Sequence, residues 1–141
     1  MDSQKFNTDG ILVTIDLVGC EFEILNCSSF LCHQAKLAVQ KAGMQVLAIS
    51  IVPFKPQGLS LALILGESHL TIHTSPEHCY AAIDIFTCGK GDPMVAATYL
   101  LNVFKPKHFL TKRIDRGVKC LIVEDKLEAV FQSKEVDHAS R

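Results

Sequence analysis

The chain has 141 residues, of which 48% are hydrophobic and 21% are charged. These values are ordinary for one globular domain with its own core. They exclude a disordered chain or a small domain that needs disulfides or a structural metal to fold. Lys and Arg number 14 and Asp and Glu number 15, so the formal net charge of −1 excludes the strongly basic surface of a nucleic-acid or anionic-membrane binder.

The hydropathy pattern and the cysteine spacing give expectations about the cellular compartment and about metal binding. The apolar runs are too short to span a bilayer and the polar first ten residues carry no signal peptide, so a cytoplasmic protein is expected. The cysteines lack any Cys-x-x-Cys or zinc spacing, so no metal site is expected, and most of them are expected to be small buried thiols. They are Cys20, Cys27, Cys32, Cys79, Cys88 and Cys120.

The first half of the chain predicts a strand, a helix and two more strands. Alternating apolar residues indicate a strand over residues 11–18, and apolar residues at helical spacing indicate a helix that stops at Gly43. Strand character returns over residues 45–52, and a turn with proline and glycine leads to an apolar central strand over residues 59–65. The candidate N-caps of the helix are Asn26, Ser28 and Ser29.

The second half predicts two strands, a helix and further strand structure. Residues 70–74 alternate, and residues 80–87 form an apolar run. Asp92, followed by proline, predicts the N-cap of a strongly apolar helix over residues 94–104. Further strands are predicted over residues 107–112 and 118–124. The last dozen residues are polar and are expected to fray.

This order of elements predicts the fold class. Most connections between strands are too short for a parallel crossover, so the sheet should be largely antiparallel. Two amphipathic helices on one face then give an α+β, two-layer α/β sandwich in a single domain over residues 1–141. The other face of the sheet would be available for a partner subunit.

A hydroxyl, an imidazole and a thiol recur near the predicted strand ends. Ser68 lies at an expected tight turn, and His73 follows on a strand where it shares one face with His69 and Thr71. Cys88 ends the next strand, so a hairpin could bring Ser68, His73 and Cys88 together for nucleophilic or acid–base chemistry. From the pattern alone, a hydrogen-bonded structural histidine and a buried cysteine remain open interpretations. The absence of a Gly-x-Ser-x-Gly elbow disfavours a Ser/His/Asp hydrolase.

Four short segments of the sequence match the pattern of a known family. They are Pro56-Gln57-Gly58, Glu67-Ser68-His69-Leu70-Thr71-Ile72-His73-Thr74, Pro76-Glu77 and Tyr80-Ala81-Ala82-Ile83-Asp84-Ile85-Phe86-Thr87-Cys88-Gly89. In these segments the chain resembles the prokaryotic S-adenosylmethionine decarboxylase proenzymes, and weaker similarity extends over most of its length. That family has a two-layer α/β sandwich, in agreement with the fold expected above.

The resemblance implies a self-processing enzyme with a covalent pyruvoyl group. The hydroxyl of Ser68 would attack the carbonyl of Glu67, and β-elimination would divide the chain into residues 1–67 and 68–141 and convert position 68 to pyruvoyl. His73 matches the family's processing histidine, and Ser60 matches a serine that hydrogen-bonds the processing intermediate. A strained turn would favour the ester over the amide.

The resemblance also implies how the processed enzyme works. The substrate amine would form a Schiff base with the pyruvoyl carbonyl, which accepts the electron pair left by departing CO2. Cys88 matches the general acid that then protonates the substrate carbon. Neither a metal nor a soluble cofactor is required. A homodimer of cleaved protomers in polyamine biosynthesis is implied, with active sites near the dimer interface.

Departures from the family pattern surround the expected substrate pocket. Ser75 stands where relatives have a Trp that stacks on adenine, whereas Phe54 matches the other stacking aromatic and is retained. The loss leaves open an alternative substrate, ornithine or arginine, whose cationic side chain could meet Asp16 or Glu77; a solvated carboxylate is the plainer interpretation of each acid. A second alternative is an unprocessed, inactive paralogue that serves as a partner subunit.

Overall fold

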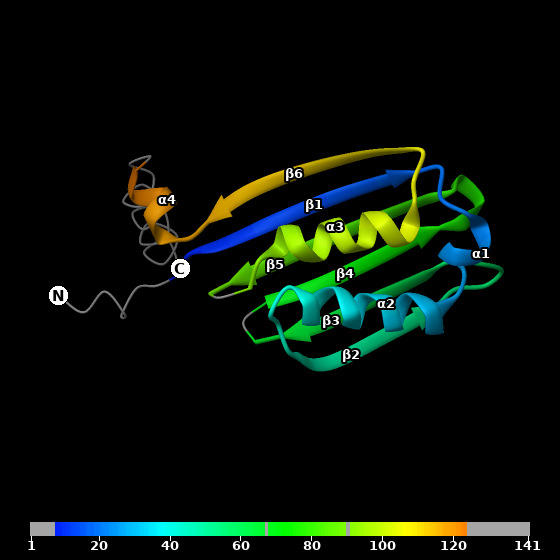
Figure 1. The fold of residues 1–141 in the computed structure, drawn as a ribbon, viewed down its shortest axis with the longest axis horizontal. Helices are drawn as coiled ribbons and strands as arrows, with labels where there is room; N and C mark the ends of the chain where they lie inside the picture. Colours follow the sequence, from blue (N-terminus) through cyan, green and yellow to red (C-terminus); the bar gives the residue numbers. More distant parts are fainter. Residues whose placement is uncertain (1–7, 67, 90, 124–141) are drawn as a thin grey trace, which may run out of the picture.

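The computed structural model describes residues 8–66, 68–89 and 91–123, which form a six-stranded sheet with helices over one face (Figure 1). The strands are β1 (Gly10–Val18), β2 (Val46–Pro53), β3 (Leu59–Leu65), β4 (Ser68–Ser75), β5 (Tyr80–Cys88) and β6 (His108–Arg116). The helices are α1 (Phe22–Leu25), α2 (Ser28–Lys41), the 3-10 turn η2 (Pro76–His78), α3 (Pro93–Phe104) and α4 (Val118–Val123). The α+β sandwich expected from the sequence is therefore confirmed.

The strand order in the sheet is β2-β3-β4-β5-β1-β6, and every neighbouring pair is antiparallel. Each connection from β2 to β5 is a hairpin or a short turn, whereas β1 inserts between β5 and β6. This insertion places the first strand of the chain beside two strands from its second half.

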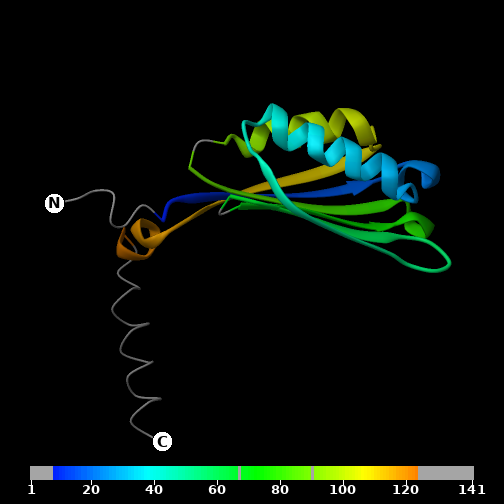
Figure 2. The same ribbon diagram turned by 90° about the horizontal axis from the view of Figure 1, so that it is seen from below.

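The core lies between the sheet and the two long helices, which cover the same side (Figure 2). Alternate residues of the strands point to this side because successive side chains in a strand face opposite ways. The buried strand residues that fill it are Val13, Ile15, Leu17, Leu59, Leu61, Leu63, Leu70, Ile72, Ile83 and Ile85. Small alanines of α2 and α3 pack against them, which brings the helices close to the sheet.

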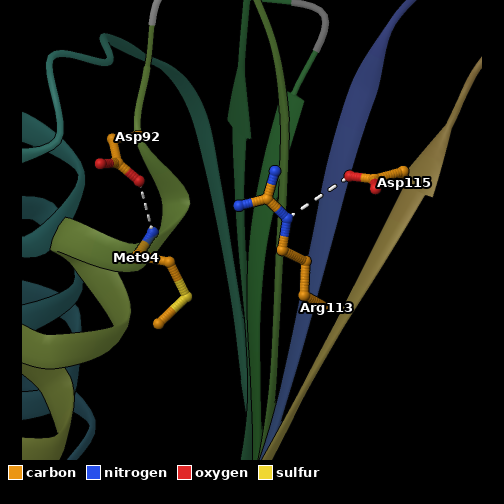
Figure 3. A network of polar contacts seen from close by, with 4 residues as sticks. All are labelled: Asp92, Met94, Arg113 and Asp115. Atoms are coloured by element: carbon orange, nitrogen blue, oxygen red, sulfur yellow. Dashed lines mark hydrogen bonds and ion pairs between the residues drawn. The ribbon is translucent and has the colours of Figure 1, made fainter.

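The predicted helix ends are partly right. Asp92 caps α3, with its Oδ1 accepting the Met94 N–H at 2.9 Å. Figure 3 draws this cap and, as a separate contact, the Arg113–Asp115 ion pair of β6. The N-cap of α2 is Cys27, not one of the predicted polar residues. The reason is tertiary, because the side chain of Asn26 instead accepts the Gly58 N–H at 2.9 Å.

The second half of the chain differs from prediction at one element. Residues 118–123 form the helix α4, so the strand predicted over residues 118–124 is wrong for the residues that the structure describes. Gly117 has φ of +135°, which ends β6, and the Val118 N–H donates to Thr8 Oγ1 at 2.8 Å where α4 begins. The last dozen residues lie outside the described part of the chain.

The face of the sheet away from the helices, here called the open face, exposes several large apolar residues. Its large exposed residues are Val18, Val52, Ile64, Leu110 and Ile114, each 46–54% exposed. Apolar patches of this kind on a folded chain mark interaction surfaces. In the described part of the chain, no helix has the length and hydropathy to cross a bilayer.

The cysteines are less buried than expected. Cys20 is in the core, but Cys27 and Cys79 are exposed and the other three are partly exposed. The expectation that most of them are buried is therefore wrong, and two thiols are open to solvent chemistry.

Candidate active site

The β3–β4 hairpin positions Ser68 at one end of the sheet. Gly66 lies in the turn, and Ser68 opens β4 opposite Leu65. The Ser68 side chain is buried, which keeps water from competing for its hydroxyl. Glu67, the expected residue before the cleavage point, lies outside the described residues.

Cys88 meets Ser68 from the neighbouring strand. The Cys88 N–H donates to Ser68 Oγ at 3.1 Å, and the two side chains approach to 3.8 Å between Oγ and Sγ. The sequence placed these residues 20 positions apart, and the β4–β5 ladder brings them together as the hairpin argument expects. A hydroxyl held by a backbone donor beside a thiol can support nucleophilic attack and proton transfer.

Ser60 and His73 form a second polar pair on the open face. They lie directly opposite each other on β3 and β4, and Ser60 Oγ is 2.7 Å from His73 Nδ1. The bond orients the imidazole, and His73 is exposed on the open face. An oriented, accessible imidazole is suited to proton transfer.

The structure does not bring His73 to the Ser68–Cys88 pair within one chain. His73 is five positions after Ser68 along β4, which at about 3.3 Å per residue is roughly 17 Å. Because five is odd, their side chains also leave the strand on opposite faces. The expected cluster of Ser68, His73 and Cys88 is therefore split between the two ends of the strand.

Asp16 lies in the same cross-strand row as His73. Asp16 pairs with Ala82, and Ala82 pairs with His73, so the three lie side by side across β1, β5 and β4 on the open face. The Tyr80 hydroxyl donates to Asp16 Oδ1 at 2.5 Å. This hydrogen bond, with a smaller effect of burial, raises the pKa of Tyr80, which keeps the phenol in its donating form.

Phe54 and Glu77, the other expected substrate residues, lie at the same end of the sheet. Phe54 follows β2 with its side chain 51% exposed, and its N–H donates to the Gly58 carbonyl at 2.8 Å. Glu77 lies in η2 and accepts from Gln57 Nε2 at 3.4 Å. Like His73 and Asp16, both residues lie far along the strands from Ser68.

Sequence reasoning missed an aromatic and cationic group beside Cys88 on the open face. The Phe86 ring contacts the His69 ring at 5.7 Å between centroids, and the Arg116 guanidinium lies 4.8 Å over it. Gly10 permits this arrangement, because a Cβ at that position would lie 2.6 Å from the Phe86 ring. The available signal was period two, which places Phe86 on the same face as Cys88.

Comparisons with known proteins place the chain in a family. The family model described as S-adenosylmethionine decarboxylase matches residues 11–117. An S-adenosylmethionine decarboxylase proenzyme of Brevibacillus brevis is 38% identical over 132 residues, covering 92% of this chain and 99% of the relative. A second relative, an S-adenosylmethionine decarboxylase proenzyme 2 of Bacillus cereus, is 37% identical over 86% of this chain and 99% of its own length.

Solved structures agree with the fold. The crystal structure of the adenosylmethionine decarboxylase from Aquifex aeolicus superimposes with a TM-score of 0.72 at 27% identity, covering 77% of this chain and 91% of that one. A Trypanosoma brucei AdoMetDC monomer shares the fold at 19% identity, with a TM-score of 0.56 over 72% of this chain and 44% of that one. With a family match over most of its length and relatives matched over almost their whole length, the chain belongs to the S-adenosylmethionine decarboxylase family.

Proposed function

We propose that this chain is a self-processing, pyruvoyl-dependent decarboxylase that acts on S-adenosylmethionine. The observation that carries the proposal is the contact between Ser68 and Cys88, which joins a buried nucleophile to a proton donor in a chain of this family. Its product would enter polyamine synthesis in the cytoplasm, as the resemblance implies.

The processing step uses the hydroxyl of Ser68. Oγ attacks the carbonyl carbon of Glu67, the peptide C–N bond breaks, and the hydroxyl proton passes to the released nitrogen, which leaves an ester. Loss of the Ser68 α-proton then breaks the Cβ–O bond, so residues 1–67 leave with a carboxylate and residues 68–141 begin with dehydroalanine. Addition of water and loss of ammonia complete the pyruvoyl group. The Cys88 N–H, which points at Oγ, stabilises negative charge on that oxygen.

The residues around position 68 fit a pyruvoyl group. The position is buried, and a backbone donor and a thiol face its oxygen. When present, the group supplies an electron sink for decarboxylation. Cys88 would hold the proton that goes to the substrate carbon, and Phe86 and Arg116 would close the open face beside it.

A homodimer would complete the site, because one chain divides it between two ends of the sheet. A two-fold axis that runs across the strands between two stacked open faces reverses the strand direction in the partner. The Ser60–His73 pair of one protomer would then lie opposite Cys88 of the other, at the end of the sheet where Cys88 contacts Ser68. Asp16, Phe54 and Glu77 lie at the same end as His73 and would arrive with it as substrate-binding residues.

Intact mass under denaturing conditions tests the proposal first. The purified chain should separate into residues 1–67 and residues 68–141, the second with a pyruvoyl terminus that lacks a free amine. Ser68→Ala should remain one chain, whereas Ser29→Ala, an exposed serine on α2, should cleave normally. A wild-type chain that persists uncleaved would refute the processing step.

Release of CO2 then identifies the substrate. S-adenosylmethionine, ornithine and arginine are supplied to the cleaved protein in parallel. Release from S-adenosylmethionine supports the proposal. Release from ornithine or arginine alone would keep the pyruvoyl chemistry but overturn the substrate.

A further inference from the structure

Cys20 and Cys79 lie against each other where β1 ends and β5 begins. The carbonyl of Cys79 accepts hydrogen bonds from the N–H groups of both Gly19 and Cys20, each at 3.0 Å. The shared carbonyl makes Cys20 and Cys79 direct backbone neighbours, and disulfides join residues whose Cα atoms are about 4.4–6.8 Å apart.

The two thiols differ in accessibility. The Cys20 side chain is 3% exposed in the core, whereas Cys79 is exposed. Burial, together with the nearby Cys79 thiol, raises the pKa of Cys20 to about 11. An exposed thiol beside a buried one is the arrangement of an entry thiol and a resolving thiol.

The backbone conformation of Cys79 makes glycine a suitable test substitution at this position. Cys79 has φ of 52° and ψ of 35°, a left-handed conformation in which glycine is unstrained and other residues are rare. Cys79→Gly therefore removes the thiol and suits the backbone, which makes it a clean test variant.

We propose that Cys20 and Cys79 form a reversible disulfide when the protein meets a low-molecular-weight disulfide such as oxidised glutathione. The Cys79 thiolate attacks one sulfur of the oxidant, forms a mixed disulfide and releases one glutathione thiolate. The Cys20 thiolate then attacks the Cys79 sulfur and releases the second glutathione. Cys20 and Cys79 are oxidised, the oxidant is reduced, and their two protons pass to the two glutathione thiolates.

The bond would join the two products of self-cleavage. Cys20 lies in residues 1–67 and Cys79 in residues 68–141, so this consequence rests on the proposed function, although the disulfide itself does not. Cys79 also precedes Tyr80, whose hydroxyl holds Asp16, so the bond would tie down the substrate end of the sheet.

Denaturing electrophoresis and intact mass without reductant test the proposal. Wild type is incubated with oxidised glutathione, quenched with an alkylating agent and compared with Cys20→Ala, Cys79→Gly and Cys27→Ser, the last removing another exposed thiol. We expect most wild-type and Cys27→Ser molecules to run as one linked species that separates into two fragments with dithiothreitol. Cys20→Ala and Cys79→Gly should show no linked species.

The outcomes separate this proposal from the proposed function. Cleaved wild type whose fragments stay unlinked would overturn the disulfide and leave the decarboxylase proposal intact. An uncleaved chain would refute the processing step, and the disulfide would then be identified by peptide mapping after cleavage at glutamates and aspartates. In that digest Glu21 separates Cys20 from Cys27 and Asp84 separates Cys79 from Cys88, so a peptide pair joined through Cys20 and Cys79 supports the bond and its absence overturns it.

Discussion

A mixture of two inactive variants tests whether His73 acts across a dimer interface. His73→Ala keeps the nucleophile, and Ser68→Ala keeps the imidazole. Proton transfer needs a separation of about 3 Å or one bridging water, whereas Ser68 and His73 of one chain lie roughly 17 Å apart along β4 and on opposite faces. Neither variant should cleave alone, but a dimer of the two contains one complete site.

The size of the rescue follows from pairing statistics. Loss of a positioned general base slows a reaction by about 100- to 10,000-fold, so His73→Ala alone should stay intact over the time in which wild type cleaves. Co-expression in equal amounts pairs half of the His73→Ala chains with a Ser68→Ala partner. We therefore expect about half of the His73→Ala chains, and none of the Ser68→Ala chains, to cleave. Intact mass distinguishes the two chains and their fragments.

A double variant provides the control for rescue. Ser68→Ala combined with His73→Ala in one chain dimerises but offers no imidazole, so mixing it with His73→Ala should give no cleavage. Cleavage of His73→Ala alone at the wild-type rate would refute the base role of His73. If size-exclusion chromatography shows dimers in the mixture but no chain is cleaved, the proposal that His73 of one protomer acts at Ser68 of the other is refuted.

Three further predictions concern single side chains. Cys88→Ala should still cleave, since the processing donor is its backbone N–H, while CO2 release falls about 100- to 10,000-fold. Ser75→Trp should lower the KM for S-adenosylmethionine about tenfold or more through a stacking platform of about 1–3 kcal/mol, with no change for ornithine. Burial raises the pKa of Cys20 from 9.0 to about 11. The neutral thiol therefore contributes its full share to the free energy of unfolding below pH 9. Urea unfolding should show that about 2–3 kcal/mol of this free energy is lost as the pH rises through 11.

Each of these predictions has an outcome that contradicts it. Cys88→Ala that no longer cleaves would give the thiol itself a role in processing. An unchanged KM in Ser75→Trp would place adenine recognition elsewhere. Because other groups titrate at high pH, the Cys20 effect is the difference between wild type and Cys20→Ala, and parallel pH curves would exclude it.

Most of the fold could be predicted because local patterns and tertiary packing agree. Alternation marked the strands, and Asp92 with its proline marked the start of α3. Prediction was wrong over residues 118–123, where a short apolar run carries no decisive period and the backbone at Gly117 redirects the chain. The cap of α2 was also wrong, since Asn26 serves Gly58 across 32 residues, a contact that no local pattern contains.

The candidate site was only partly predictable, because residues meet according to strand order and to the parity of their separation along a strand. Ser68 and Cys88 meet through one hairpin, so their pairing follows from the order of the strands. His73 was grouped with them although an odd separation from Ser68 puts it on the other face. The same parity correctly groups His73 with His69 and Thr71. The contact between Cys20 and Cys79 depends on how β1 inserts beside β5, which the order of elements along the chain does not specify.

That insertion also explains how the chain would stay folded after the proposed cleavage. Residues 1–67 contain β1, β2 and β3, and residues 68–141 contain β4, β5 and β6. Since β1 lies between β5 and β6 while β3 pairs with β4, the two fragments interleave in one sheet and share three antiparallel ladders. Side chains from both fragments fill one core. Cutting the β3–β4 turn removes a covalent link at the edge of this arrangement and leaves the ladders intact, so the chain can break beside Ser68 without losing the surface that positions it.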